Sequence, residues 1–483
     1  MKTLIEAVLL GAALQAVPVA TAQTLEVRDG KIPAKPDPAR RPLNVPNSVL
    51  PSSFAFQPLP YDEDYTRMAD PTLRNNTWAR LKNIPVIDDV YLTVGGELRG
   101  RIEARHNLNF GRGPEDEGLY PQYRARVWTD VHLSDSVRVF SEIQSSGTTG
   151  RLHQYGAIDD NGTDLHQAFV EFKRPLGGGS LTVRGGRQEI SFGKARIFDT
   201  RNGPNTRRAY DAGRLIWAQG AWRAGAFGGA VVQEVLGSWK DRTNDGFTFF
   251  GGNVARKLDG WFAGSELEAL FVHTDREAGA PTYVGKRDTL SLRLAGRKGK
   301  LDYDAEFVGQ RGRSQIGQVK AWYTGLDAAY QLPGRLSPRV GVRADVGSGD
   351  SHPGNGTDGT YDYLGSRGMT LTAELGFSNL VAVGPTFGLK PSRTVTAELT
   401  FSELRRMTRA DGLYSMTSAL IRRADEGSSK QVGVRATGRI DHQWNRFLLS
   451  GLYFAYIDAD RFLKETGDGK DLAYAALYTV VRL

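Results

Sequence analysis

The chain has 483 residues, a net charge of +8 and no cysteine, which excludes disulfides, thiol chemistry and thiolate-bound metals. No internal apolar run approaches the roughly 20 residues that a membrane helix requires, so a helical membrane protein is excluded. The 57 glycines, 18 tyrosines and 21 phenylalanines favour twisted strands with aromatic girdles. A mean hydropathy of −0.39 is compatible with a membrane β-barrel, because lipid-facing residues alternate there with polar lumen residues.

The N-terminus has the pattern of a signal peptide. Met1 to Thr3 is a short basic start, residues 4–14 are mostly apolar, and Ala20-Thr21-Ala22 precedes Gln23 as an A-x-A cleavage pattern. We therefore expect residues 1–22 to be removed near Ala22 during export. For an exported protein, the positive charge indicates anionic lipid or an acidic substrate and excludes nucleic acid as a partner.

Residues 23–90 do not have the composition of a folded core. Eight prolines between Pro33 and Pro60 predict an extended periplasmic segment over residues 23–69. Asp70-Pro71 is typical of a helix N-cap followed by proline, and predicts a short helix over about 70–83 with a lead-in to residue 90. That helix either leans on the following domain as a small amphipathic element or acts as a periplasmic plug or docking handle.

From Tyr91 the hydrophobic pattern has a period of two. Leu92, Val94, Leu98 and Ile102 lie on one face of the predicted strand, and Glu97, Arg99, Arg101, Glu103 and Arg105 lie on the other. Residues 290–297, 301–307, 339–346 and 431–440 alternate in the same way. Short turns separate pairs of these segments, and longer polar links such as 191–208 and 348–379 join the pairs. The pattern predicts an all-β fold: a single transmembrane antiparallel barrel of about 18 strands over residues 91–483, with a water-filled lumen and both termini in the periplasm.

Arginine on inward positions suits a solute that carries carboxylates, because the guanidinium group is always charged and matches carboxylate geometry. The alternation places Arg99, Arg101, Arg124, Arg126, Arg435 and Arg439 on the lumen face. Carboxylates are predicted to face inward as well, among them Glu97, Glu142, Asp304 and Glu306. The alternative role for any of these arginines is therefore a cross-strand ion pair that stiffens the wall.

The link between about 191 and 214 is the most basic one. Lys194, Arg196, Arg201, Arg207, Arg208 and Arg214 face only Asp199 and Asp211 there. Such a loop either folds inward to form a selectivity constriction, which we favour, or lies outside against anionic lipopolysaccharide.

Enzymatic functions find little support in the sequence. The seven histidines are scattered, none has metalloprotease spacing, and there is no Gly-x-Ser-x-Gly elbow or phosphate loop. We expect no enzyme, no cofactor and no metal, although a Ser/His pair brought together only in space would escape this argument.

Three groups of motifs resemble the alginate export family of outer-membrane porins. They are Trp78 to Pro85 with Leu92 to Arg99; Gly186 to Gly193 with Arg196, Asn205, Arg208 and Asp211; and Asp411 to Tyr414 with Phe462 to Asp471. The resemblance covers about residues 70–483 in the family's order. The chain departs from the family at Gly203-Pro204, where many members have a tryptophan, and at Ala212, which is usually glycine. The resemblance implies an outer-membrane channel and, by the family's name, a route for a polyuronate.

Together these observations predict an outer-membrane channel for passive passage of an anionic polysaccharide or oligosaccharide, an alginate-like polyuronate, through an arginine-rich lumen. The alternative is an uptake porin for small acidic solutes. We expect outer-membrane lipid and lipopolysaccharide as surroundings and periplasmic and inner-membrane export machinery as partners. The conduit residues expected from the alternation, the basic loop and the resemblance are Arg99, Arg101, Arg124, Arg126, Arg187, Arg196, Arg207, Arg208, Asp211, Arg435 and Arg439.

Overall fold

The computed structural model describes residues 56–74, 76–87, 89–113, 117–150, 156–277, 284–362 and 375–483. The expected signal peptide and most of the proline-rich segment lie outside the described residues. Cleavage near Ala22 and the domain boundaries at residues 22 and 69 therefore stay predictions.

The part of the chain before the barrel consists of short elements. They are η2 (Pro60–Asp62), η3 (Thr66–Ala69), η4 (Pro71–Leu73), α2 (Thr77–Arg80) and β1 (Ile84–Ile87). Asp70 caps η4, as its Asp-Pro pattern predicts, and accepts a hydrogen bond from the Thr72 backbone at 2.9 Å. The helix expected over residues 70–83 is shorter than predicted, because the Asn76 side chain caps a new start at α2.

Trp78 of α2 fixes this N-terminal part to the barrel. Its ring packs against Phe56, Tyr65 and Phe447, with 5.5 Å between the ring centroids of Trp78 and Phe447. Phe447 lies in a short turn between two barrel strands. The expectation that this helix leans on the following domain is thus confirmed.

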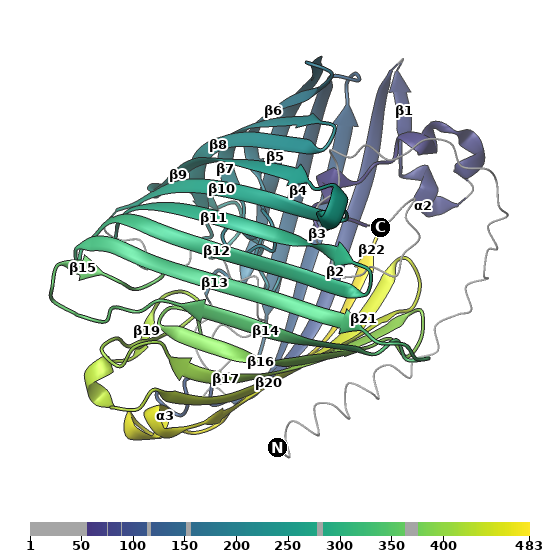
Figure 1. Cartoon of the computed structure of the whole chain (residues 1–483). Helices are drawn as coiled ribbons and strands as arrows, with labels where there is room; N and C mark the ends of the chain where they lie inside the picture. Colours follow the sequence, from purple (N-terminus) through teal and green to yellow (C-terminus); the bar gives the residue numbers. More distant parts are fainter. Residues whose placement is uncertain are drawn as a thin grey trace.

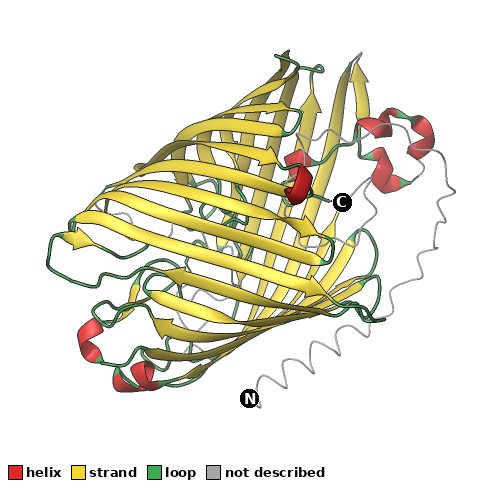
Figure 2. Ribbon diagram, viewed as in Figure 1, coloured by secondary structure: helices red, strands yellow, loops and turns green. Residues whose placement is uncertain are grey.

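The regular secondary structure in the rest of the described chain is almost entirely strand (Figure 2). The long strands are β2 (Val90–His106), β3 (Gly118–His132), β4 (Val137–Thr148), β5 (Asn161–Leu176), β6 (Gly179–Gln188), β7 (Tyr210–Gln219), β8 (Trp222–Gln233), β9 (Arg242–Lys257), β10 (Ser265–Arg276), β11 (Gly285–Lys298), β12 (Leu301–Ser314), β13 (Gln318–Gln331), β14 (Arg339–Gly347), β16 (Leu380–Leu389), β17 (Val395–Arg406), β20 (Gln431–Gln443), β21 (Leu448–Ala459) and β22 (Leu472–Arg482). Small elements in the connections are η5 (Gly260–Phe262), β15 (Thr357–Asp358), β18 (Leu413–Tyr414), β19 (Leu420–Arg422), η6 (Ala424–Glu426) and α3 (Arg461–Glu465).

These strands close into a barrel (Figure 1). The main sheet has 20 strands, of which β1 and β15 are short additions, and the remaining 18 pair with their neighbours along the chain. The last strand, β22, pairs antiparallel with β2 from Glu97↔Arg482 to His106↔Ala473 and so removes both free edges. The predicted count of about 18 antiparallel strands is confirmed.

The two rims of the barrel differ in the length of their connections. One rim has short turns such as 177–178, 220–221 and 299–300, and both the start of β2 and the end of β22 lie there. The other rim carries long connections such as 189–209, 407–430 and the described parts of 348–379, with 315–317 as a short exception. In outer-membrane barrels the short turns face the periplasm, and we name the rims accordingly.

Strand alternation separates a polar inside from an apolar outside. On β2, Glu97 and Arg99 are 5% and 6% exposed and face the lumen, whereas Leu98 between them is 54% exposed on the outer surface. Phe307 and Leu290 are exposed on the outside in the same way. The first strand therefore has the two faces that its sequence predicts. Among the described residues, no helix is long and apolar enough to cross a membrane.

The outward position of Leu98 near the middle of β2 gives a test of the membrane orientation. Leu98→Arg should destabilise the folded protein by about 2–4 kcal/mol, because it places a charge near the bilayer midplane. Leu133→Arg, in the exposed turn 133–136, should cost about 0–1 kcal/mol. Urea titrations in phospholipid vesicles measure both values, and equal costs would contradict the membrane orientation.

Candidate functional site

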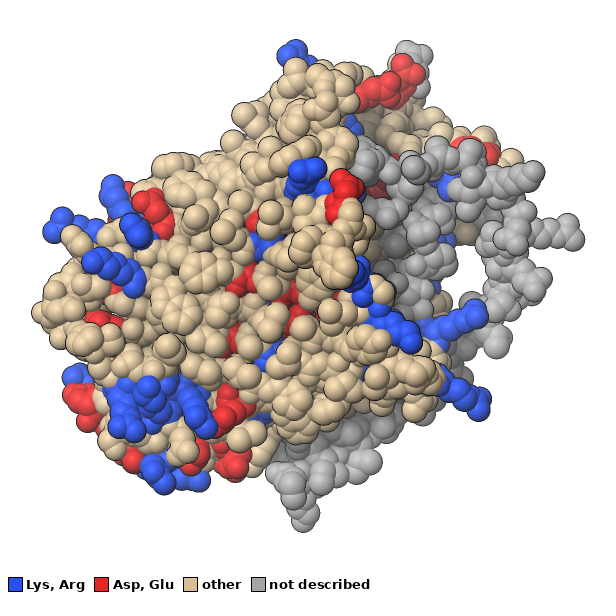
Figure 3. Space-filling view, in the orientation of Figure 1, with Lys and Arg blue, Asp and Glu red and all other residues tan. Residues whose placement is uncertain are grey.

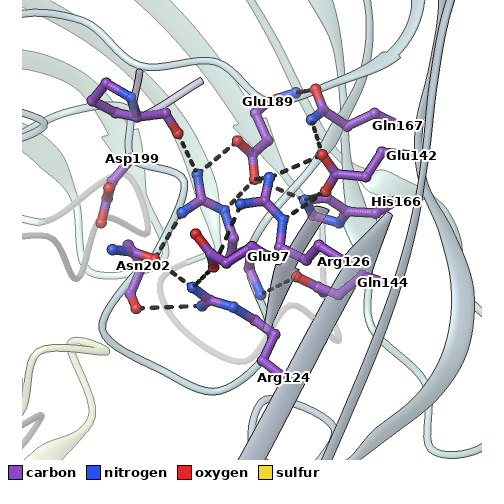
Figure 4. A network of polar contacts seen from close by, with 12 residues as sticks. Glu97, Arg124, Arg126, Glu142, Gln144, His166, Gln167, Glu189, Asp199 and Asn202 are labelled. Atoms are coloured by element: carbon purple, nitrogen blue, oxygen red, sulfur yellow. Dashed lines mark hydrogen bonds and ion pairs between the residues drawn. The ribbon is translucent and has the colours of Figure 1, made fainter. Parts of the chain in front are cut away.

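The connection between β6 and β7, residues 189–209, lies inside the barrel. Arg99 of β2 donates hydrogen bonds to the backbone oxygens of Asn202 at 2.7 Å and Pro204 at 2.8 Å. Arg124 of β3 donates to the Asn202 side-chain oxygen at 2.7 Å (Figure 4). Because Arg99 and Arg124 face the lumen and are almost fully buried, this basic loop folds inward, and its role as a selectivity constriction stays a prediction.

Local sequence explains how this loop, which we call the lumen loop, holds its shape. Asn205 is fully buried and its amide donates to the backbone oxygens of Tyr123, Gly147 and Asp159 at 2.9–3.1 Å. Phe198 supplies an apolar anchor, with its ring centroid 5.1 Å from that of Phe249 on β9. One side chain thus satisfies polar backbone groups and the other fills an apolar patch of the inner wall.

The lumen loop also reaches the opposite wall. Arg196 donates to Asp304 and Glu306 of β12, each at 2.9 Å. Going round the barrel, seven strands separate β12 from β2 in one direction and nine in the other. Contacts to β2 and to β12 therefore mean that the loop crosses the lumen.

Ion pairs between inward side chains hold the wall beneath the loop (Figure 4). Arg124 pairs with Glu97 at 2.8 Å. Arg126 donates two hydrogen bonds to the two carboxylate oxygens of Glu142, at 2.7 and 2.9 Å. Arg207 of the lumen loop pairs with Glu189. These arginines therefore form ion pairs with neighbouring carboxylates, as buried guanidinium groups usually do.

The positive charges of this region exceed the carboxylates that pair with them. Among the described residues, no carboxylate lies within ion-pair distance of Arg99, whose partners are two loop carbonyls and the Asn205 amide oxygen. Glu103 is shared by Arg101 and Arg105. Burial raises the pKa of Asp199 in the loop to about 6 against the opposing effect of nearby arginines, so this carboxyl group is still mostly ionised at neutral pH and offsets part of the excess.

The N-terminal segment enters the lumen below the loop. The Tyr61 hydroxyl donates to the Glu189 backbone oxygen at 2.7 Å, and Arg207 donates to the Pro58 backbone oxygen at 3.3 Å. The Tyr61 ring packs against Phe169, and Arg184 lies 4.3 Å over its face. Burial raises the pKa of Tyr61 to about 12, so the hydroxyl stays protonated and can donate. The N-terminal segment inside the lumen is therefore residues 58–61. It is not the predicted helix over residues 70–83, for which a plug role was considered.

A second connection touches the inner wall towards the long-loop rim. Asp358 and Asp362, both from the connection 348–379, pair with Arg287 and Arg276 at 2.8 Å. The part of this connection from 363 to 374 lies outside the described residues. The described ion pairs tie this connection to β10 and β11.

The arginines that water can reach lie on other strands. The side chains of Arg439 on β20, Arg297 on β11, Arg339 on β14 and Arg343 on β14 are 51%, 58%, 31% and 26% exposed. Each still has an acidic neighbour, such as Asp441 for Arg439 and Asp327 for Arg343, both at 2.7 Å. A solute would meet these groups, whereas Arg99, Arg101, Arg124, Arg126, Arg196 and Arg207 are 1–6% exposed and shape the passage.

The remaining predicted conduit residues lie elsewhere. Arg187 and Asp211 face each other across β6 and β7 and pair at 2.8 and 3.0 Å. By alternation with the buried Gln188 and Ala212 they point to the outer surface and do not join the lumen network. Arg435 is buried on the inner face of β20. Arg208 is partly buried within the lumen loop, where its backbone N–H donates to the Thr200 backbone oxygen.

One cluster has the donor types of a metal site. Ligand atoms of Glu142, His166 and Glu189 lie within 4.8 Å of one another, and this cluster, which the sequence does not reveal, joins three separate chain segments. Arg126 and Arg207 already bond the two carboxylates. Two guanidinium groups at these oxygens oppose the binding of a cation, so the cluster is an ion-pair network.

The fold and the site can now be compared with known proteins. The family model described as alginate export matches residues 90–468. The chain belongs to the alginate export family. Its barrel is similar to that of OpdK from Pseudomonas aeruginosa with vanillate, at a TM-score of 0.56 and 11% identity, covering 83% of this chain and 100% of that one. A search of curated proteins found no match.

Two further solved structures have the same fold. OccK2 (OpdF) from Pseudomonas aeruginosa in complex with glucuronate gives a TM-score of 0.52 at 12% identity, and a BenF-like porin from Pseudomonas fluorescens Pf-5 gives 0.54 at 10%. Each comparison covers 81% of this chain and 98% of the other. At such identities the likeness concerns the fold alone. The family and the closed barrel together support an outer-membrane channel, a transporter rather than an enzyme.

A disulfide can test the docking of the lumen loop. Ser146 of β4 and Thr206 of the loop have hydroxyl oxygens 2.8 Å apart, and the chain has no native cysteine. Ser146→Cys combined with Thr206→Cys should form a disulfide in air, and its reduction should leave single-channel conductance within about 10%. Failure to form the bond, or a large change on reduction, would contradict a permanently docked loop. The two single variants are the controls.

Removal of the Tyr61 side chain should widen the passage. Tyr61→Ala deletes a ring that packs against both Phe169 and Arg184 in the lumen, and we expect a higher single-channel conductance in planar bilayers. Tyr61→Phe keeps the ring and loses only the bond to Glu189, so its conductance should stay close to that of the unmodified protein. An unchanged conductance in Tyr61→Ala would mean that ions pass elsewhere.

Proposed function

We propose that this protein is a passive outer-membrane conduit for an anionic polysaccharide or oligosaccharide of the polyuronate type. The observation that carries the proposal is the lumen loop, which crosses the barrel and is held by Arg99, a cation with carbonyl partners instead of a carboxylate. A positive excess at a constriction with low-dielectric walls concentrates anions there.

Arginine chemistry favours a carboxylate-bearing solute. A polyuronate carries one carboxylate on each sugar, which a guanidinium group can bind with two parallel hydrogen bonds. The exposed arginines Arg297, Arg339, Arg343 and Arg439 lie on several strands of the inner wall and each has an acidic neighbour. These acidic neighbours weaken each contact, so a charged chain can move from one arginine to the next without being trapped.

The proposed conduit needs other components to deliver a polymer to it. Periplasmic and inner-membrane export machinery would place the polymer at the short-turn rim, where the N-terminal part packs against the barrel through Trp78. The residues before Phe56 would lie on the same side of the membrane after cleavage near Ala22. Outer-membrane lipid and lipopolysaccharide would surround the barrel.

Uptake of small acidic solutes is the second candidate. The lumen loop and Tyr61 both occupy the lumen, and together they leave less room for a polymer than the strand number alone suggests. OpdK and OccK2, whose structures are described with vanillate and glucuronate, have a similar fold. Graded ligand length separates the two candidates.

Current block by oligouronates tests the proposal. The purified protein in planar bilayers should show block that deepens with chain length from one to about ten uronate units. Arg339→Gln combined with Arg343→Gln and Arg439→Gln should weaken that block about tenfold, because a solute loses three accessible cations. Arg256→Gln, on the outer surface, is the matched control and should change nothing.

Two other results of the current-block experiment would contradict the polymer conduit. Strong block by single uronates or small aromatic acids, with no gain from longer chains, would replace the polymer conduit with the uptake porin. Indifference to every acidic solute would contradict both candidates.

A further inference from the structure

A row of basic residues lies on the outer surface near the long-loop rim. Arg311 and Arg313 of β12 and Lys320 of β13 are exposed. In the strand register Arg311 is directly opposite Lys320, and Arg313 is directly opposite Lys286 of β11. We call Arg311, Arg313 and Lys320 the outer basic patch. Figure 3 shows Lys and Arg side chains gathered at the end of the barrel where these strands finish.

The patch has more basic than acidic side chains in register, although Asp288 of β11 is directly opposite Arg311. Like charges directly opposite one another in a sheet repel and destabilise the pair. Among the described residues, no hydrogen bond or ion pair involves the side chains of Arg311, Arg313 or Lys320. The nearest acids in register are already engaged, because Asp275 pairs with Lys286 at 2.9 Å and Asp288 with His273 at 2.7 Å.

The connection between β10 and β11 supplies one acid. Glu277 begins this connection, and the following residues 278–283 are Ala, Gly, Ala, Pro, Thr and Tyr, which carry no charge. The outer basic patch and Lys286 together thus have four basic side chains against the three acids Asp275, Glu277 and Asp288, and a molecule from outside the chain or solvent ions supply the remaining negative charge.

The position of the patch relative to the apolar band of the barrel indicates which kind of molecule binds it. On the outer face of β12 and of the neighbouring β11, Phe307 and Leu290 are 52% and 49% exposed and belong to the apolar band. Trp322 lies two residues from Lys320 on the same face and opposite Gly309. Tryptophan marks the boundary between acyl chains and head groups, so the patch lies at the level of the head groups of the outer leaflet.

We propose that the outer basic patch binds the phosphate groups of a phosphorylated glycolipid in the outer leaflet, with the acyl chains against Phe307 and Leu290. Two arginines and a lysine on adjacent strands provide forked and point-like donors that suit a phosphate. This site lies outside the lumen and does not depend on the proposed conduit function.

Native mass spectrometry of the detergent-purified protein tests this site with three probes: bis-phosphorylated lipid A, dephosphorylated lipid A and phosphatidylglycerol. We expect bis-phosphorylated lipid A to bind most tightly. The triple variant Arg311→Gln, Arg313→Gln, Lys320→Gln should bind it at least fivefold more weakly. Dephosphorylated lipid A should bind both proteins equally.

The matched control is the triple variant Arg174→Gln, Arg256→Gln, Lys298→Gln, which removes three exposed basic residues near the short-turn rim. It should keep the affinity of the unmodified protein for bis-phosphorylated lipid A. Equal losses in the two triple variants, or no loss in the first, would overturn the site. Tighter binding of phosphatidylglycerol than of lipid A would overturn the glycolipid assignment. Heat-modifiable electrophoretic mobility and unchanged conductance verify that each variant is folded.

Discussion

The buried contact between guanidinium groups and oxygen acceptors inside the barrel is the interaction on which the rest of the structure depends. The inner face of the 18-stranded barrel carries many buried charged side chains, which must be paired because they lie away from bulk water. Arg126 with Glu142 and Arg293 with Asp304 satisfy this requirement across neighbouring strands. Loss of one member of such a pair costs about 3–5 kcal/mol, since it leaves an uncompensated charge.

The same chemistry fixes what lies within the lumen. The lumen loop docks on Arg99 and Arg124 of one wall and on Asp304 of the other. Arg99 has its hydrogen-bond partners in the loop, and Arg124 and Asp304 add loop contacts to their ion pairs with Glu97 and Arg293. The N-terminal segment is held by the same kind of contact, because Arg138 donates to the Tyr61 backbone oxygen at 2.6 Å. Residues distant in sequence thus form one polar network across the barrel.

Alternation of residue types is a local property, and it therefore predicted the strands, the inward face of β2 and the two kinds of connection. The basic composition of residues 191–214 favoured an inward loop for the same reason, since such a loop needs acidic or carbonyl partners. Partner choice is not local, so the sequence could not show that Arg196 reaches β12 or that Tyr61 enters the lumen. Arg187 and Asp211 were placed in the conduit by motif resemblance, but strand alternation turns both outward at the ends of β6 and β7. The role of the remaining arginines in selectivity stays a prediction.

The central claim is that the lumen loop creates a constriction with an excess of positive charge. The zero-current potential of a single channel under a tenfold KCl gradient at low ionic strength measures this excess most directly. The account predicts a potential of the sign given by chloride selectivity, reduced towards zero in high salt as the charges are screened. A potential of the opposite sign, showing potassium selectivity, would contradict it and would make the paired acids of the wall the dominant charges.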